Sequence, residues 1–219
     1  MSAERRGSLG VLLGSGETGV ASRGAVSACA GAMGSGAEAY LYLLHDGVHH
    51  VHEPAFQRLR DRGLRLFCCA FGARRRGIEP DDAAIYCGLG VLSDIVASVD
   101  RFLCFTGSPW DGQTGEADRV APGRARRRIQ IRAISNPDLT DLPAEGVRVA
   151  VGLLASGRLD VGLAFGGEAR RCVEAGAENL RDGRDMVMHL ESFRGGGGEV
   201  RLDAGRDASV TGWFSVLGF

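Results

Sequence analysis

Short apolar segments alternate along this 219-residue chain with segments of helical periodicity, and this alternation restricts the fold more than any other feature of the sequence. The apolar segments lack a helical period, as buried strands do. We expect such strands at residues 9–13, 39–44, 66–69, 101–105, 128–134, 159–165, 199–202 and 210–219. Strands that alternate with helices pair in parallel through right-handed crossovers. The sequence therefore predicts an α/β fold whose mostly parallel sheets are flanked by helices.

Apolar residues recur every three or four positions in the segments between these strands, as one buried face of a helix requires. The predicted stripes are Val26/Cys29/Ala30/Met33, Ile85/Leu89/Leu92/Val96 after Pro80, Val147/Ala150/Val151/Leu154 and Met186/Leu190/Phe193. Further helices are expected at residues 54–62 and 168–177, and Asp185 is expected to cap the last helix.

The alternation of strands and helices runs through the chain twice. Residues 106–126, between the two runs, have no period and contain glycine, proline, aspartate and threonine, as a linker does. We therefore expect a first unit at residues 8–106, a linker at 107–126 and a second unit at 127–219, related to the first by internal duplication.

Composition and charge exclude several classes of function. The net charge is −1, so nothing draws the chain as a whole to nucleic acid or to an anionic membrane. All 26 basic residues are arginine, which excludes Schiff-base chemistry on lysine. No apolar run is long enough for a signal peptide or a membrane span, and the six cysteines lack metal-type spacing. These features predict a cytoplasmic protein with reduced thiols and no cofactor.

Cys69 is the candidate nucleophile. It ends the apolar run that begins at Leu66, and ligands gather at the carboxyl ends of strands in open α/β sheets. Arg74, Arg75 and Arg76 follow closely, and nearby cations favour a thiolate. The neighbouring Cys68 should face the other side of the sheet and serve only in packing.

Four of the five histidines fall between residues 45 and 52. His45 and Asp46 follow the second strand, so they should lie beside Cys69 if the two strands are neighbours, and His45 is the best candidate for proton transfer. A second reading is a zinc or copper site. Its candidate ligands are His45, His49, His50 and His52, with Glu53 and Cys69 as possible additions. The third reading is a polar loop that leads into a helix.

A glycine-rich turn follows the first strand. Gly14, Ser15 and Gly16 begin a Gly-x-Gly-x-x-Gly spacing that is completed by Gly19. Such a turn before a helix can hold an anion or a small ligand on backbone N–H groups, and Arg74–Arg76 could add positive charge to the same site.

Residues 9–105 resemble the DsrE/DsrF-like family of sulfur-relay proteins. The resemblance rests on the glycine turn and on residues 41–48 (LYLLHDGV), 69–78 (CAFGARRRGI) and 88–94 (GLGVLSD), followed by Asp100-Arg101-Phe102. The spacing from the cysteine to Arg-Gly is its specific part. It implies that Cys69 accepts sulfane sulfur as a persulfide and passes it to a partner thiol, and that sulfur-donor and sulfur-acceptor proteins are its partners. It also implies assembly as a homotrimer or a hexamer.

The second half resembles the same family more faintly. The position that corresponds to Cys69 is Asp203, so we expect this half to lack an acceptor thiol and to complete an oligomer. The remaining cysteines are expected to be structural, namely Cys29, Cys68, Cys87, Cys104 and Cys172, with Cys29 and Cys87 on helices. A function of a different class stays open, that of a non-catalytic ligand-binding or scaffold protein.

Overall fold

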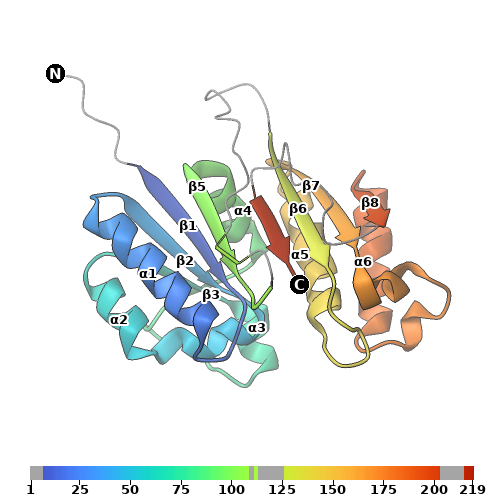
Figure 1. The fold of residues 1–219 in the computed structure, drawn as a ribbon, viewed down its shortest axis with the longest axis horizontal. Coiled ribbons are helices and arrows are strands. Elements are labelled where there is room, and N and C mark those ends of the chain that lie inside the picture. Colours follow the sequence, from blue (N-terminus) through green and yellow to red (C-terminus); the bar gives the residue numbers. More distant parts are fainter. Residues whose placement is uncertain (1–6, 109–110, 113–125, 203–214) are drawn as a thin grey trace. The chain divides into compact units, whose positions relative to one another are not determined.

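The computed structural model describes residues 7–108, 111–112, 126–202 and 215–219. The chain divides into two compact units, residues 1–112 and residues 113–219, each of which has its own sheet (Figure 1). Every strand pair in both sheets is parallel, and helices flank the strands. The predicted α/β fold class is therefore confirmed. No helix in the described part of the chain is long and apolar enough to span a membrane.

The first unit is built on a five-stranded sheet with the order β4-β3-β2-β1-β5. Its strands are β1 (Ser8–Leu13), β2 (Glu38–Leu43), β3 (Arg65–Cys69), β4 (Ile85–Cys87) and β5 (Arg101–Phe105). Its helices are α1 (Val20–Gly34), α2 (Pro54–Asp61), α3 (Ala70–Arg75) and α4 (Leu89–Ser98), with a 3₁₀ segment η1 (His45–His52) after β2.

The order of strands in the first unit reverses at β1. The chain moves from β1 outward through β2 and β3 to β4, and then returns to place β5 on the other side of β1. Right-handed crossovers therefore put α1 and α2 on one face of the sheet and α4 on the other, as Figure 1 shows. The carboxyl edge of such a sheet is where sites form.

The second unit is built on a four-stranded sheet with the order β8-β7-β6-β9. Its strands are β6 (Arg127–Ala133), β7 (Leu159–Phe165), β8 (Glu199–Leu202) and β9 (Ser215–Gly218). Its helices are α5 (Leu142–Ala155) and α6 (Gly183–Gly195), and two 3₁₀ segments, η2 (Gly167–Val173) and η3 (Ala177–Asn179), follow β7.

The two units share one strand order, because β6, β7, β8 and β9 take the places of β1, β2, β3 and β5. A local feature repeats as well. Gly24 of α1 lies against the ring of Phe105 at the end of β5, so a Cβ atom on this glycine would come within 2.5 Å of the ring. Gly146 of α5 lies against Phe219 after β9, where a Cβ atom would be 3.1 Å from Cβ of Phe219 and 3.2 Å from the first ring atom. Both features favour the internal duplication expected from the sequence.

The expected helix from Pro80 with Ile85 in its buried stripe is wrong. Residues 85–87 form the strand β4, Ile85 is 57% exposed, and α4 begins only at Leu89. Gly88, with an extended backbone, separates the two elements. The β-branched and aromatic residues of Ile85-Tyr86-Cys87 pair with β3, and this pairing overrides the helical spacing. Cys87 therefore lies on a strand and not on a helix.

The buried faces of the other helices differ in part from the predicted stripes. In α1 the buried residues are Ala21, Ser22, Ala25 and Cys29, whereas Val26 and Met33 are only half-buried. Small side chains allow this face to approach the sheet more closely than the larger ones could. In α5, Val147 and Ala150 are buried as predicted, but Val151 and Leu154 are only half-buried.

The remaining expectations concern the second unit. The stripe Met186/Leu190/Phe193 of α6 is confirmed, although Asp182 rather than Asp185 precedes its first residue. The helix expected at residues 168–177 is a 3₁₀ segment as far as Val173, and a second 3₁₀ segment begins at Ala177. Asp203, which we matched to Cys69, and most of the expected linker lie outside the described residues.

Candidate functional site

The carboxyl edge of the first sheet brings together segments that follow four different strands. Cys69 ends β3, and the residues after Leu44 follow β2, which is the neighbour of β3. Backbone hydrogen bonds connect the glycine turn after β1 to the segment after β2 and to the end of β5. The Gly47 N–H donates to the Gly14 carbonyl oxygen at 3.1 Å, and the Gly14 N–H donates to the carbonyl oxygen of Phe105 at 2.8 Å.

Cys69 is both the last residue of β3 and the residue that caps α3. Its Sγ accepts a hydrogen bond from the Gly72 N–H at 3.4 Å. This N–H can stabilise negative charge that develops on the sulfur. The Cys69 side chain is only 1% exposed. The chain continues from Cys69 directly into α3.

Gly72 allows α3 to lie close against the start of η1. A Cβ atom on Gly72 would lie 3.3 Å from the Val48 side chain, 3.5 Å from Cβ of Cys69 and 3.6 Å from the backbone nitrogen of His45. Cys69 and the backbone of His45 therefore converge on the same glycine. The expectation that His45 and Asp46 follow the strand next to Cys69 is confirmed.

His45 has a backbone conformation that side chains other than glycine rarely adopt. Its φ is +52° and its side chain is 4% exposed. Gly167 occupies the equivalent place in the second unit, two residues after β7, and its φ is also +52°. A left-handed conformation costs a residue with a Cβ atom about 1–2 kcal/mol. Such strain at a buried polar residue marks His45 as a functional candidate.

A series of polar side chains leads from His45 toward the surface. His45 Nδ1 lies 3.3 Å from Asp46 Oδ2, and the same carboxylate binds Arg76 through Oδ1, at 2.7 Å from Nε and 2.6 Å from Nη2. Arg76 also contacts the Gly72 carbonyl oxygen at 3.5 Å, which connects the pair to the helix capped by Cys69. Sequence reasoning found these three residues, but not that Asp46 joins the other two.

The three arginines do not form one basic cluster. Arg74 and Arg75 are exposed and lie near the ring of Phe71, each with its guanidinium carbon 5.9 Å from the ring centre. Only Arg76 turns toward Asp46, since it follows α3 and its side chain is largely buried. Arg74 and Arg75 are the last two residues of α3, and Arg76 follows the helix.

The histidines of η1 lie in different surroundings and do not face one common site. His50 is buried, with Nε2 donating to the Ser15 carbonyl oxygen at 3.0 Å and Nδ1 against the carboxylate of Glu53. His49 is exposed, and His52 is exposed beside Asp81 at 3.4 Å. Within the described ranges, no group of three histidine, cysteine, aspartate or glutamate side chains is placed to hold a metal ion.

The glycine turn is held against η1 rather than left as an open cradle. The Ser15 carbonyl is engaged by His50, and a Cβ atom on Gly16 would lie 2.7 Å from Cβ of Asp46. Asp46 therefore packs closely against the glycine turn, and the anion site expected at Gly14–Gly16 stays a prediction.

Burial raises the pKa of four other thiols. The pKa rises to about 12 for Cys29 and Cys68, and to about 11 for Cys87 and Cys172. Cys87 nevertheless differs from the other three, because it is partly exposed and lies in register with Cys69 on the adjacent strand. Sequence reasoning missed this neighbour because it assigned Cys87 to a helix. The run Ile85-Tyr86-Cys87, with its high strand propensity, was the available signal.

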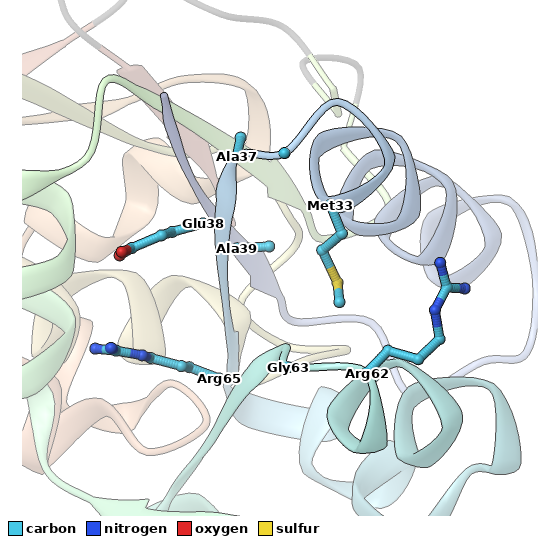
Figure 2. A pocket seen from close by; sticks show the side chains of 8 residues that line it. Met33, Ala37, Glu38, Ala39, Arg62, Gly63 and Arg65 are labelled. Carbon is cyan, nitrogen blue, oxygen red and sulfur yellow. The ribbon is translucent and has the colours of Figure 1, made fainter. Parts of the chain in front are cut away.

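The described cavities lie elsewhere. Figure 2 shows a pocket of about 360 Å³ whose lining includes Met33, Glu38, Arg62 and Arg65, at the amino ends of β2 and β3. A groove of about 450 Å³ runs beside α1 and is lined by small residues that include Ser27 and Gly31. Neither contains a residue of the carboxyl edge. Comparison with known protein families, curated proteins and solved structures finds no match for this chain.

Proposed function

We propose that the first unit is a sulfur carrier that accepts sulfane sulfur as a persulfide on Cys69 and passes it to a partner thiol. The observation that supports this function best is the position of the Cys69 sulfur. It lies at the carboxyl end of a parallel strand, with the Gly72 N–H directed at it and the backbone of His45 nearby.

The proposed transfer is a thiol–persulfide exchange. His45 takes the proton of the Cys69 thiol, and the thiolate attacks the outer sulfur of a donor persulfide. The S–S bond of the donor breaks, a new S–S bond forms on Cys69, and the donor leaves as a thiolate. Asp46 holds the imidazole in place, and Arg76 in turn holds Asp46. Delivery to the acceptor thiol repeats the exchange with Cys69 as the leaving group.

Transfer requires that the sulfur donor can reach the Cys69 sulfur. Because Cys69 is 1% exposed, a donor reaches its sulfur only after α3 shifts away from the carboxyl edge. This helix has only six residues, so its movement disrupts little of the sheet.

The donor and acceptor are proposed to be separate sulfur-relay proteins in the cytoplasm, and the chain is proposed to assemble as a homotrimer or a hexamer. Both proposals rest on the family resemblance. Light scattering at micromolar concentration should report three or six chains. A stable monomer would contradict the assembly without affecting the chemistry of Cys69.

The test of the carrier function is mass spectrometry of the full chain after incubation with a small-molecule persulfide donor. The wild-type protein should gain one sulfur atom on the peptide that contains Cys69. Cys69→Ser should abolish this gain, whereas Cys68→Ser should keep it. Cys68 is a matched control because it precedes Cys69 in β3, faces the other side of the sheet and is equally buried.

The burial of Cys69 favours one competing function, that of a non-catalytic ligand-binding or scaffold protein. In that case no cysteine gains sulfur, and wild-type protein and Cys69→Ser behave alike in every transfer assay. That outcome would refute the carrier function.

A further inference from the structure

Cys87 is the direct neighbour of Cys69 across two parallel strands. The registered pairs of β3 and β4 are Phe67 with Ile85, Cys68 with Tyr86, and Cys69 with Cys87. Residues in register on neighbouring parallel strands face the same side of the sheet, and their strands lie about 4.8 Å apart. A disulfide requires Cα atoms about 4.4–6.8 Å apart. The register therefore places these two cysteines within disulfide range.

No other cysteine has this relation to Cys69. All six cysteines lie in the described residues, and none of them forms a disulfide. Cys68 faces the opposite side of β3, Cys29 is on α1, Cys104 pairs with Leu12 on β1, and Cys172 belongs to the second unit. Only Cys87 can reach the Cys69 sulfur with a small adjustment.

The surroundings of Cys87 permit that adjustment and leave Cys87 itself partly open to solvent. Cys87 ends a three-residue strand at the edge of the sheet, and it is partly exposed. The next residue is Gly88, where a Cβ atom would meet no other atom within 4 Å. Ile85, on the same face of β4 as Cys87, is 57% exposed, so this face is open at the edge.

We propose that Cys87 is a resolving cysteine for the persulfide on Cys69, an inference that rests on the proposed sulfur-carrier function. The Cys87 thiolate attacks the Sγ atom of the Cys69 persulfide. A Cys69–Cys87 disulfide forms, the bond between Sγ and the sulfane sulfur breaks, and the sulfane sulfur leaves as hydrosulfide with the electron pair of that bond. The two cysteine sulfurs are oxidised and the sulfane sulfur is reduced, so no external oxidant is needed.

The resolved state is reset by a low-molecular-weight thiol. One thiol attacks the Cys69–Cys87 disulfide to give a mixed disulfide, and a second releases the protein thiol as a free thiol–thiol disulfide. The protein thus has two outlets for bound sulfur, which are transfer to a partner thiol and discharge as hydrosulfide. The partner must compete with Cys87 for the same persulfide.

The first arm of the test examines the cysteine pair without any persulfide. The full chain is incubated with oxidised glutathione, and its peptides are mapped by mass spectrometry without reduction. A peptide that links Cys69 to Cys87 should form in the wild-type protein and in Cys68→Ser, and it should be absent from Cys87→Ser. Absence of the link in the wild-type protein would overturn the proposal.

The second arm follows hydrosulfide released from protein loaded with a small-molecule persulfide donor and then freed of the donor. The wild-type protein should release hydrosulfide as the disulfide forms, and Cys87→Ser should hold its persulfide at least about tenfold longer. Equal release rates would overturn the resolving role alone. If the wild-type protein takes up no sulfur, the carrier function fails as well, so the two failures are distinguishable.

Discussion

Replacing His45 with glycine should leave the protein more stable than replacing it with alanine, which is the reverse of the usual order. Both variants lose the same buried imidazole, so their difference isolates the backbone. At φ +52° the Cβ atom of alanine costs about 1–2 kcal/mol, whereas glycine adopts this conformation freely. Glycine ordinarily costs about 0.5–1 kcal/mol relative to alanine because of its larger entropy in the unfolded chain. Taking the middle of each range, the glycine variant should therefore be the more stable by about 0.75 kcal/mol.

The assay is urea unfolding followed by far-ultraviolet circular dichroism, with a matched pair of variants at His50. His50 is also a buried histidine of η1, but its φ is not positive, so His50→Ala should be more stable than His50→Gly. Gly167 supplies the reciprocal change. Gly167→Ala should destabilise the second unit, because its Cβ atom is strained at φ +52° and would lie 3.2 Å from the Ile134 carbonyl oxygen.

The reasoning would be refuted if His45→Ala were as stable as His45→Gly or more stable. The backbone at residue 45 would then carry no strain, and the main argument for a functional His45 would be lost. If the glycine variant is the more stable, the backbone at residue 45 is strained and the structural argument for His45 as a functional candidate stands.

Two further predictions use Cys87 and α1. Burial raises the pKa of Cys87 to about 11, so the fraction of Cys87 present as thiolate should rise about tenfold per pH unit between about pH 7 and 9. The rate of hydrosulfide release from the Cys69 persulfide should rise by the same factor. A rate that does not change with pH, measured by sulfide assay, would contradict attack by this thiol. Gly24→Ala should lower the free energy of unfolding by about 1–3 kcal/mol, because its Cβ atom would come within 2.5 Å of the Phe105 ring. Gly31→Ala on the same helix should raise the free energy of unfolding by about 0.5–1 kcal/mol, because a Cβ atom at Gly31 meets nothing within 4 Å. Equal changes for Gly24→Ala and Gly31→Ala in urea unfolding would be inconsistent with the packing described.

The sequence predicts the mostly buried strands well because their apolar signal is strong and local. The strand expected at residues 159–165 matches β7 at both ends, and the one at 101–105 matches β5. The segment at residues 80–96 failed for a physical reason. Ile85, Leu89, Leu92 and Val96 have helical spacing, but pairing with β3 decides the conformation of residues 85–87, and pairing partners are not visible in a local pattern.

The candidate site, too, could be predicted from the sequence only in part. That Cys69 and His45 would meet at one edge followed from the expectation that their strands are neighbours, and β2 and β3 are paired. The positive φ of His45 could not be predicted, because residue type favours the opposite conformation and the tight turn imposes it. The register of Cys87 with Cys69 depends on a strand that the helical pattern concealed.

The extra strand β4 distinguishes the environments of two otherwise equivalent strands. Among the described residues of the second unit no strand lies outside β8, so β8 is an edge strand, whereas its counterpart β3 is enclosed between β2 and β4. The three residues of β4 thus make β3, the strand that carries Cys69, an interior strand of the sheet. The same three residues place a second thiol, that of Cys87, beside Cys69. A cysteine at the end of β8 would gain neither the shelter nor the neighbour. The strand β4 therefore supplies Cys69 with both a flanking strand and a neighbouring thiol, and deleting or lengthening β4 would change both at once.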